Sequence, residues 1–282
     1  MACETNYVIL TQHPFLRVLS TRRYIIKTPA SMPRPAPLIL CVVALLASCR
    51  TPPPAEEILT IAAAANLTDV LGEVGRAFDA KTGIKVIFSY GSTAQLATQI
   101  ENGAPFDLFA AADTEHVDSL VSTRKLLGDT RAVYALGQLA LWIPEGEKLG
   151  IRELKDLAGQ QIKFIAIAQP ELAPNGQASV DVLKGAGLWV AVQPKLVYGS
   201  SVSMAKQYAA SGSANAAFTA YSLVLHEKGT VLKIDSHLHK PIEQALGIVA
   251  ASAHLKEAKQ FRLFLLGAEG RTILANNGYL LP

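Results

Sequence analysis

Small polar residues stand at four predicted helix starts, and their types and positions favour a binding site for an anion. The first N–H groups of a helix have no intrahelical partner, and they lie at the positive end of the helix dipole. If the N-termini of several helices met at one point, they would bind an anion without any charged side chain. Each residue also fits an ordinary helix cap, so the prediction requires that they come together. The residues are Asn66, Ser92 with Thr93, Asn175 and Ser201.

Signals for catalysis are scarce by comparison. The sequence contains no Gly-x-Ser-x-Gly elbow, no P-loop and no Gly-x-Gly-x-x-Gly motif. All three cysteines lie within residues 1–49, so the rest of the chain has none for a nucleophile, an internal disulfide or a cysteine zinc site. His237 and His239 form a close pair, but their polar surroundings fit a solvated loop better than a metal site. We therefore expect a binding protein without a cofactor, and we disfavour a hydrolase.

The predicted secondary structure places the polar residues at strand ends. From residue 58 onwards, short apolar runs alternate with amphipathic stretches, which is typical of an α/β fold. Tyr90-Gly91-Ser92-Thr93 and Tyr198-Gly199-Ser200-Ser201 each join a predicted strand to a predicted helix, the position at which parallel sheets bind ligands. One such segment in each half favours two similar lobes that face a cleft. Strands are predicted at 58–63, 85–89, 106–111, 133–143, 162–168, 195–198, 214–219 and 245–251.

Length and composition limit the class of protein. The 282 residues are 50% hydrophobic and 17% charged, which allows two medium lobes with packed cores and excludes disorder for most of the chain. The net charge is +3, but residues 1–48 hold five of the 26 basic residues and only one of the 23 acidic ones. The remaining chain is close to neutral and has no basic stripe, so we exclude a nucleic-acid partner.

The N-terminal segment has the pattern of a secretion signal. Residues 38–47 form an apolar run that is too short to span a bilayer but fits a signal-peptide core. The run ends in Leu46-Ala47-Ser48-Cys49, which resembles the bacterial lipobox, whose cysteine is lipidated. We expect a signal peptide at 1–48, with translation starting at Met32, and a lipidated Cys49. Residues 49–57 would follow as a stiff, proline-rich spacer that holds an extracytoplasmic body off the membrane.

Several segments of the body resemble the molybdate-binding proteins of ABC transporters. The most specific is the block 100–113, which contains Glu101-Asn102-Gly103-Ala104-Pro105-Phe106-Asp107 and follows the similar run 90–99. The resemblance covers about 58–282 and implies a type II periplasmic-binding fold, with two α/β lobes, two crossover strands and an oxyanion buried in the cleft. One lobe would comprise 58–137 plus 243–282, and the other 138–242. The other similar segments are 61–67, 134–142, 170–176 and 270–279.

The resemblance also implies a set of ligand residues. Asn175 and Val202 would bind through their backbone N–H groups. Ala220 stands where some relatives have a tyrosine ligand, which leaves the anion preference open. The matching positions are Ala65, Asn66, Ser92, Thr93, Asn175 and Val202, with Ser201 and Tyr221 as further candidates.

The function implied is capture of molybdate or tungstate by a lipid-anchored, monomeric solute-binding protein. It would deliver the anion to a transmembrane permease that is driven by a cytoplasmic ATPase. A fully ionised oxyanion only accepts hydrogen bonds, whereas a protonated phosphate also needs an acceptor, and no Asp or Glu occupies a matching position. Two alternatives stay open: another oxyanion such as sulfate or thiosulfate, and a sensor lobe that passes the bound anion to a signalling partner.

Overall fold

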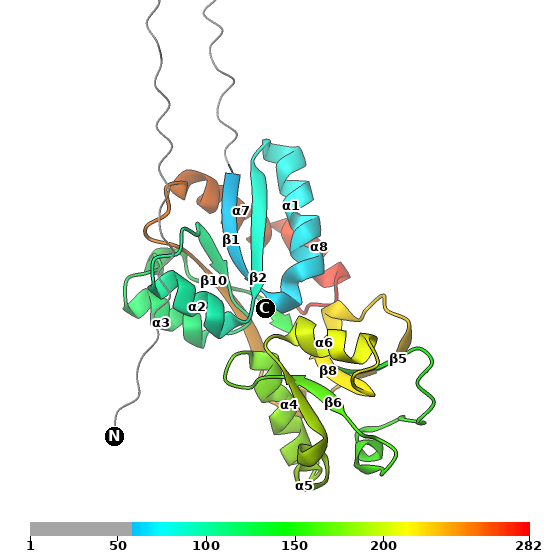
Figure 1. The fold of residues 1–282 in the computed structure, drawn as a ribbon. Helices are drawn as coiled ribbons and strands as arrows, with labels where there is room; N and C mark the ends of the chain where they lie inside the picture. The colour runs from blue at the N-terminus through cyan, green and yellow to red at the C-terminus, as the bar shows by residue number, and fades with distance from the viewer. Residues whose placement is uncertain (1–57) are drawn as a thin grey trace, which may run out of the picture. The chain divides into compact units, whose positions relative to one another are not determined.

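The computed structural model describes residues 58–282, which form two five-stranded sheets with helices on both faces of each (Figure 1). This is the mixed α/β architecture that the sequence predicts. Cys49, the predicted signal peptide and the spacer lie outside the described residues. None of the helices between residues 58 and 282 combines the length and the apolar character that crossing a bilayer requires.

The first sheet has a parallel centre and an antiparallel return strand. Leu59 and Ile61 of β1 are buried on one face and Ala62 is buried on the other, because helices cover both faces of the sheet. β1 pairs in parallel with β2 and β3, and β10 runs antiparallel to both of its neighbours. In spatial order the strands are β2 (Lys85–Gly91), β1 (Ile58–Ala64), β3 (Leu108–Ala110), β10 (Ile242–Ile248) and β4 (Ala132–Gly137).

Two groups of amphipathic helices cover this sheet. On one face, the apolar stripe of α1, which includes Leu71, Val74 and Phe78, packs with α7 and α8 in one core. The helices α2 and α3 pack in a second core on the other face. The helices are α1 (Thr68–Thr82), α2 (Thr93–Glu101), α3 (Glu115–Ser122), α7 (Leu255–Leu266) and α8 (Ala268–Asn276).

The second sheet repeats this plan. α4 and α5 pack on one face, and α6 packs on the other. β5 runs antiparallel to β8 and β9, whereas β6 pairs in parallel with β7 and β8. The strands in spatial order are β7 (Leu196–Gly199), β6 (Ile165–Ala168), β8 (Ala216–Ala220), β5 (Leu139–Pro144) and β9 (Gly229–Lys233), and the helices are α4 (Pro174–Gly185), α5 (Trp189–Val192) and α6 (Val202–Ala210).

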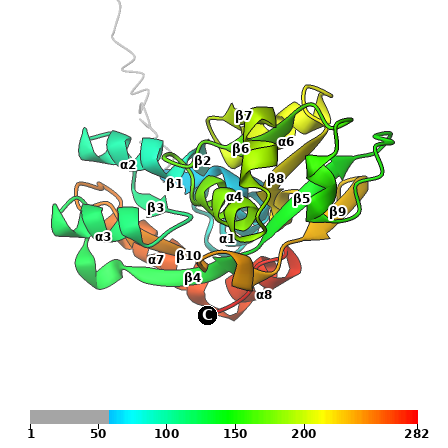
Figure 2. The ribbon, with the colours of Figure 1, turned by 90° about the horizontal axis from the view of Figure 1, so that it is seen from below.

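The chain passes between the sheets at two places. β4 ends at Gly137 and β5 begins at Leu139, so the single strand predicted at 133–143 is wrong, and the chain changes sheets at Gln138. A side chain at Gly137 would clash with Gln244, because its Cβ would lie 2.7 Å from Nε2. The second passage precedes β10, which pairs with β4 (Figure 2). β9 was not predicted, because its residues are mostly exposed and give no apolar run.

Short 3-10 helices complete the fold. Two of them directly follow strands: η1 follows β1, and η5 follows β8. Ala65 of η1 and Leu223 of η5 belong to one small buried apolar cluster. They are η1 (Ala65–Leu67), η2 (Gly128–Thr130), η3 (Leu154–Ala158), η4 (Gln193–Lys195), η5 (Tyr221–Leu223) and η6 (Ser236–Leu238).

Candidate functional site

The starts of four helical segments meet at one cavity between the two sheets. The turn η1 and helix α2 reach it from the first sheet, and helices α4 and α6 reach it from the second. None of the lining residues carries a charge. They are Ala64, Ala65, Asn66, Gly91, Ser92, Thr93, Ala112, Ala173, Pro174, Asn175 and Val202, and they include all six matching positions named from the sequence.

Two cavity residues have buried polar atoms without a hydrogen-bond partner. They are Oγ of Ser92 and Nδ2 of Asn175, in side chains that are 2% and 3% exposed. An unpaired buried group costs about 1–3 kcal/mol, so such groups call for an explanation. An amide nitrogen can only donate, and a hydroxyl can donate its hydrogen. The cavity therefore suits a ligand that accepts hydrogen bonds.

Ser92 and Ser201 have similar sequence contexts, but their hydroxyl groups differ in their hydrogen bonds. Both are the N-cap residues of helices, α2 and α6 respectively. The Ser201 hydroxyl caps its helix by accepting from the Met204 N–H at 3.2 Å, and Ser201 does not line the cavity. The Ser92 side chain makes no capping bond. Ordinary capping thus accounts for Ser201 and not for Ser92.

This contrast predicts different effects of two matched substitutions. Ser92→Ala removes an unpaired donor, and we expect binding of the oxyanion predicted from the sequence to be weaker by about tenfold or more, since one charge-assisted bond is worth about 1.5–3 kcal/mol. Ser201→Ala removes a cap and should cost about 1 kcal/mol of stability with little change in affinity. Titration calorimetry and thermal unfolding would measure both. Equal affinity losses in the two variants would contradict this assignment.

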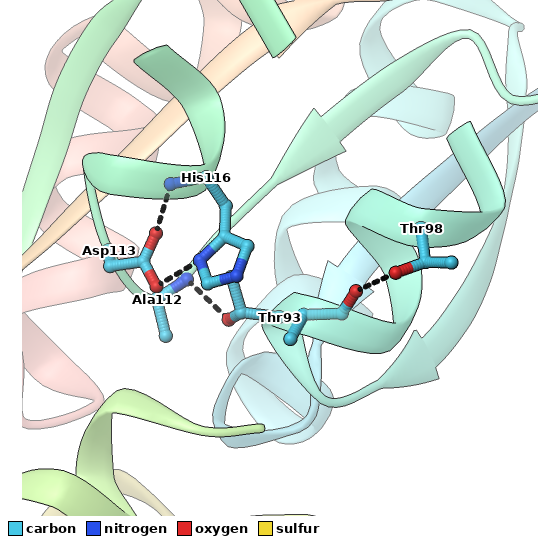
Figure 3. A network of polar contacts seen from close by, with 6 residues as sticks. Thr93, Thr98, Ala112, Asp113 and His116 are labelled. Carbon is cyan, nitrogen blue, oxygen red and sulfur yellow. Dashed lines mark hydrogen bonds and ion pairs between the residues drawn. The ribbon is translucent and has the colours of Figure 1, made fainter. Parts of the chain in front are cut away.

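Thr93 is oriented by the loop that follows β3. Its Oγ1 accepts a hydrogen bond from the Ala112 N–H at 3.2 Å (Figure 3). The side chain is 1% exposed, and its hydroxyl hydrogen stays available for donation. The Ala112 N–H is already used in this bond. Thr93 can therefore present a donor to the cavity beside Ser92.

The side-chain amide of Asn66 forms hydrogen bonds within the protein. Its Nδ2 donates to Gln244 Oε1 at 3.0 Å and to the Tyr279 hydroxyl at 3.1 Å, and the Tyr279 hydroxyl donates to the Asn66 carbonyl at 2.8 Å. Burial raises the pKa of Tyr279, which keeps this hydroxyl neutral. The backbone N–H of Asn66 lies in the first turn of η1, where N–H groups have no intrahelical partner, so it is a candidate donor to the cavity. Local spacing does not indicate the roles of Gln244 and Tyr279, because each is more than 170 residues away from Asn66.

Direct bonds between the two halves close the site. The Ser203 hydroxyl, in α6, donates to the Ala65 carbonyl, in η1, at 2.9 Å. The Ala94 N–H, in α2, donates to the Leu172 carbonyl at 3.2 Å. Ala65 and Val202 also belong to a small buried apolar cluster at this junction. The structure thus has the two halves in contact around the cavity.

Two further positions named from the sequence lie outside the cavity lining. The Tyr221 ring lies under the Lys233 ammonium, with Nζ 4.4 Å from the ring centroid, and does not line the cavity. Ala220 is 3% exposed and packs in the apolar cluster near the site. Tyr221 therefore does not stand in for the tyrosine ligand of some relatives in this arrangement.

The two histidines of the pair contact their own sequence neighbours. His237 contacts Asp235 in an exposed turn, and His239 contacts the Lys240 carbonyl. Within residues 58–282, no three His, Cys, Asp or Glu side chains are grouped so that they could hold a metal ion. The solvated loop expected from the sequence fits these contacts.

Comparison with known proteins points to one family. The family model described as bacterial extracellular solute-binding protein matches residues 59–280. The molybdate-binding protein ModA of Rhodobacter capsulatus is 33% identical over 239 residues, which cover 84% of this chain and 94% of that protein. YvgL of Bacillus subtilis (strain 168), named provisionally as an ABC transporter substrate-binding lipoprotein, is 29% identical over 224 residues, covering 78% of this chain and 85% of YvgL. The solved structure of the periplasmic molybdate-binding protein of Azotobacter vinelandii has a TM-score of 0.75 and 31% identity, covering 79% of this chain and 99% of that one.

Proposed function

This chain belongs to the bacterial extracellular solute-binding protein family, and from that membership we propose that it is the molybdate-binding component of an ABC transporter. One observation supports the choice of an oxyanion as the ligand. Ser92 Oγ and Asn175 Nδ2 are buried and have no hydrogen-bond partner, and both residues line an uncharged cavity at four helix starts. A fully ionised tetrahedral oxyanion would accept hydrogen bonds from these groups and from the free backbone N–H groups.

The proposed ligand set combines side-chain and backbone donors. Ser92 and Thr93 would donate through their hydroxyls, and Asn175 through Nδ2 and its N–H. The N–H groups of Ala65, Asn66 and Val202 would complete the set. Binding would shift an equilibrium between open and closed arrangements of the two lobes, 58–137 plus 243–282 and 138–242, toward the closed one.

Tungstate shares the charge and shape of molybdate, and we propose that it binds as well. Sulfate, thiosulfate and a role as a sensor lobe are the alternatives. No carboxylate lines the cavity, which disfavours a phosphate that carries a proton. Co-purification with a membrane permease and an ATPase would favour transport over sensing, and a monomer is expected in both cases.

We further propose that Cys49 is lipidated and that 49–57 is the spacer to the membrane. The lipobox-like sequence supports this proposal. Cys49→Ala is expected to move the protein from the membrane fraction to the soluble extracytoplasmic fraction, because two acyl chains are needed for stable anchoring. Mass spectrometry of the N-terminal peptide would measure the lipid, and detection of any peptide from residues 1–31 in a digest of whole cells would contradict the start at Met32. A membrane-bound alanine variant would contradict the anchor.

Thermal unfolding tests the ligand class. For residues 50–282, ligand at about 100 times its dissociation constant stabilises the fold by about 2.7 kcal/mol. This corresponds to a rise in the midpoint of about 5–11 °C for a body of this size. We expect the rise with molybdate and tungstate, and little change with sulfate or phosphate. A rise with sulfate would keep the binding fold and change the ligand, and no rise with any anion would contradict an oxyanion site.

A further inference from the structure

A wider recess adjoins the anion cavity and is rich in acidic side chains. The recess shares Ala112, Ala173 and Pro174 with the cavity, and it lies between residues of both lobes. An anion in the cavity is therefore close to the charges of the recess. The charged and titratable residues that line the recess are Asp113, Glu115, His116, Glu171, Asp181, Lys240 and Glu243.

Asp113 directly follows Ala112, which lines the cavity and bonds to Thr93. Its carboxylate is paired with His116: Oδ2 lies 2.8 Å from Nδ1, and Oδ1 accepts the His116 N–H at 3.0 Å (Figure 3). The two side chains are 20% and 31% exposed, so the pair is partly shielded from water. A carboxylate in this place would repel an anion unless its charge were balanced.

We propose that His116 balances the charge of Asp113 at the edge of the anion cavity and thereby makes anion capture depend on pH. This inference rests on the proposed function of the cavity as an oxyanion site. His116 acts on the anion through Asp113 and the field of the recess, so it is a positioning residue and not a ligand.

The charged groups around His116 determine whether anion binding strengthens or weakens as the pH rises. The hydrogen bond to Asp113 raises the pKa of His116 above its usual 6.5, against the opposing effect of burial, and the charges of Asp113, Glu115 and Glu101 raise it further. Across the recess, the carboxylates of Glu171, Asp181 and Glu243 and the ammonium of Lys240 face the same space. As the pH rises through this pKa, His116 loses its charge, the recess becomes more negative, and anion binding weakens.

Titration calorimetry with molybdate between about pH 6 and pH 9 tests the proposal in the mature chain. The wild type should lose affinity by about three- to tenfold as the pH rises, less so at high salt. By linkage, molybdate binding should also drive proton uptake near the pKa of His116, which calorimetry in buffers of different ionisation enthalpy measures. His116→Gln should bind weakly at every pH and take up no proton.

The double variant Asp113→Asn with His116→Gln tests whether His116 acts through its charge or through its structural contacts. It removes both charges, and the amide oxygen introduced at position 113 can still accept the N–H of residue 116, so affinity should recover and become independent of pH. His254→Gln is the matched control, because His254 pairs with Asp107 away from both the cavity and the recess. An unchanged profile in His116→Gln, or no recovery in the double variant, would overturn the inference. No molybdate binding by the wild type at any pH would instead overturn the proposed function.

Discussion

Replacing Asn175 by Asp is expected to weaken molybdate binding by about 100-fold or more. Asn175 Nδ2 is a buried donor with no partner in the protein, at the start of α4. The substitution keeps the size of the side chain but exchanges the donor for a negative charge. Loss of one charge-assisted bond costs about 1.5–3 kcal/mol, and repulsion between a carboxylate and a dianion in a desolvated cavity adds to this.

In the free protein, burial of the carboxylate carries a desolvation cost. The helix dipole offsets part of this cost, because a carboxylate in the first turn of a helix gains about 0.3–1 kcal/mol. Calorimetry at about pH 8, where the carboxylate is ionised, measures the affinity, and thermal unfolding without ligand checks the fold. Asn175→Ala is the control that removes the donor without adding charge, and we expect about a tenfold loss. If the Asp variant binds as tightly as the Ala variant, the side chain of residue 175 does not face the anion.

Val202→Pro is expected to weaken molybdate binding by about ten- to 100-fold, because it deletes one backbone donor. Val202 is the first residue of α6, where proline is well tolerated, since the N–H at this position has no intrahelical partner. The preceding Ser201 has φ −149° and ψ 168°, an extended conformation that a following proline allows. The change therefore removes a hydrogen atom from the proposed site with little disturbance of the helix.

Val202→Ala is the matched control, because it shortens the side chain and keeps the N–H. It should bind with nearly the affinity of the wild type. Calorimetry of both variants, with unfolding midpoints in the absence of ligand, distinguishes the two contributions. If alanine and proline reduced affinity equally while the fold held, the contribution of residue 202 would come from its side chain, and the backbone assignment would be wrong.

The sequence determined the local structure well. Apolar periodicity located strands such as β1 and helices such as α1, because burial on one face imposes a spacing that is visible in the chain. The same reasoning failed at 133–143. An apolar strand pattern looks the same whether the chain continues in one sheet or passes to another, and the change of sheet at Gln138 leaves no periodic signal.

The roles of the polar residues were decided by the tertiary structure. Ser92 and Ser201 have the same local context, a glycine-containing turn between a strand and a helix, yet only Ser201 caps its helix. Asn66 is held by Gln244 and Tyr279, which come from the far end of the chain. Residue type and helix position specify which groups can donate a hydrogen bond. Whether those donors meet at one cavity or are used within their own helices depends on how the two sheets face each other, and local spacing carries no information about that.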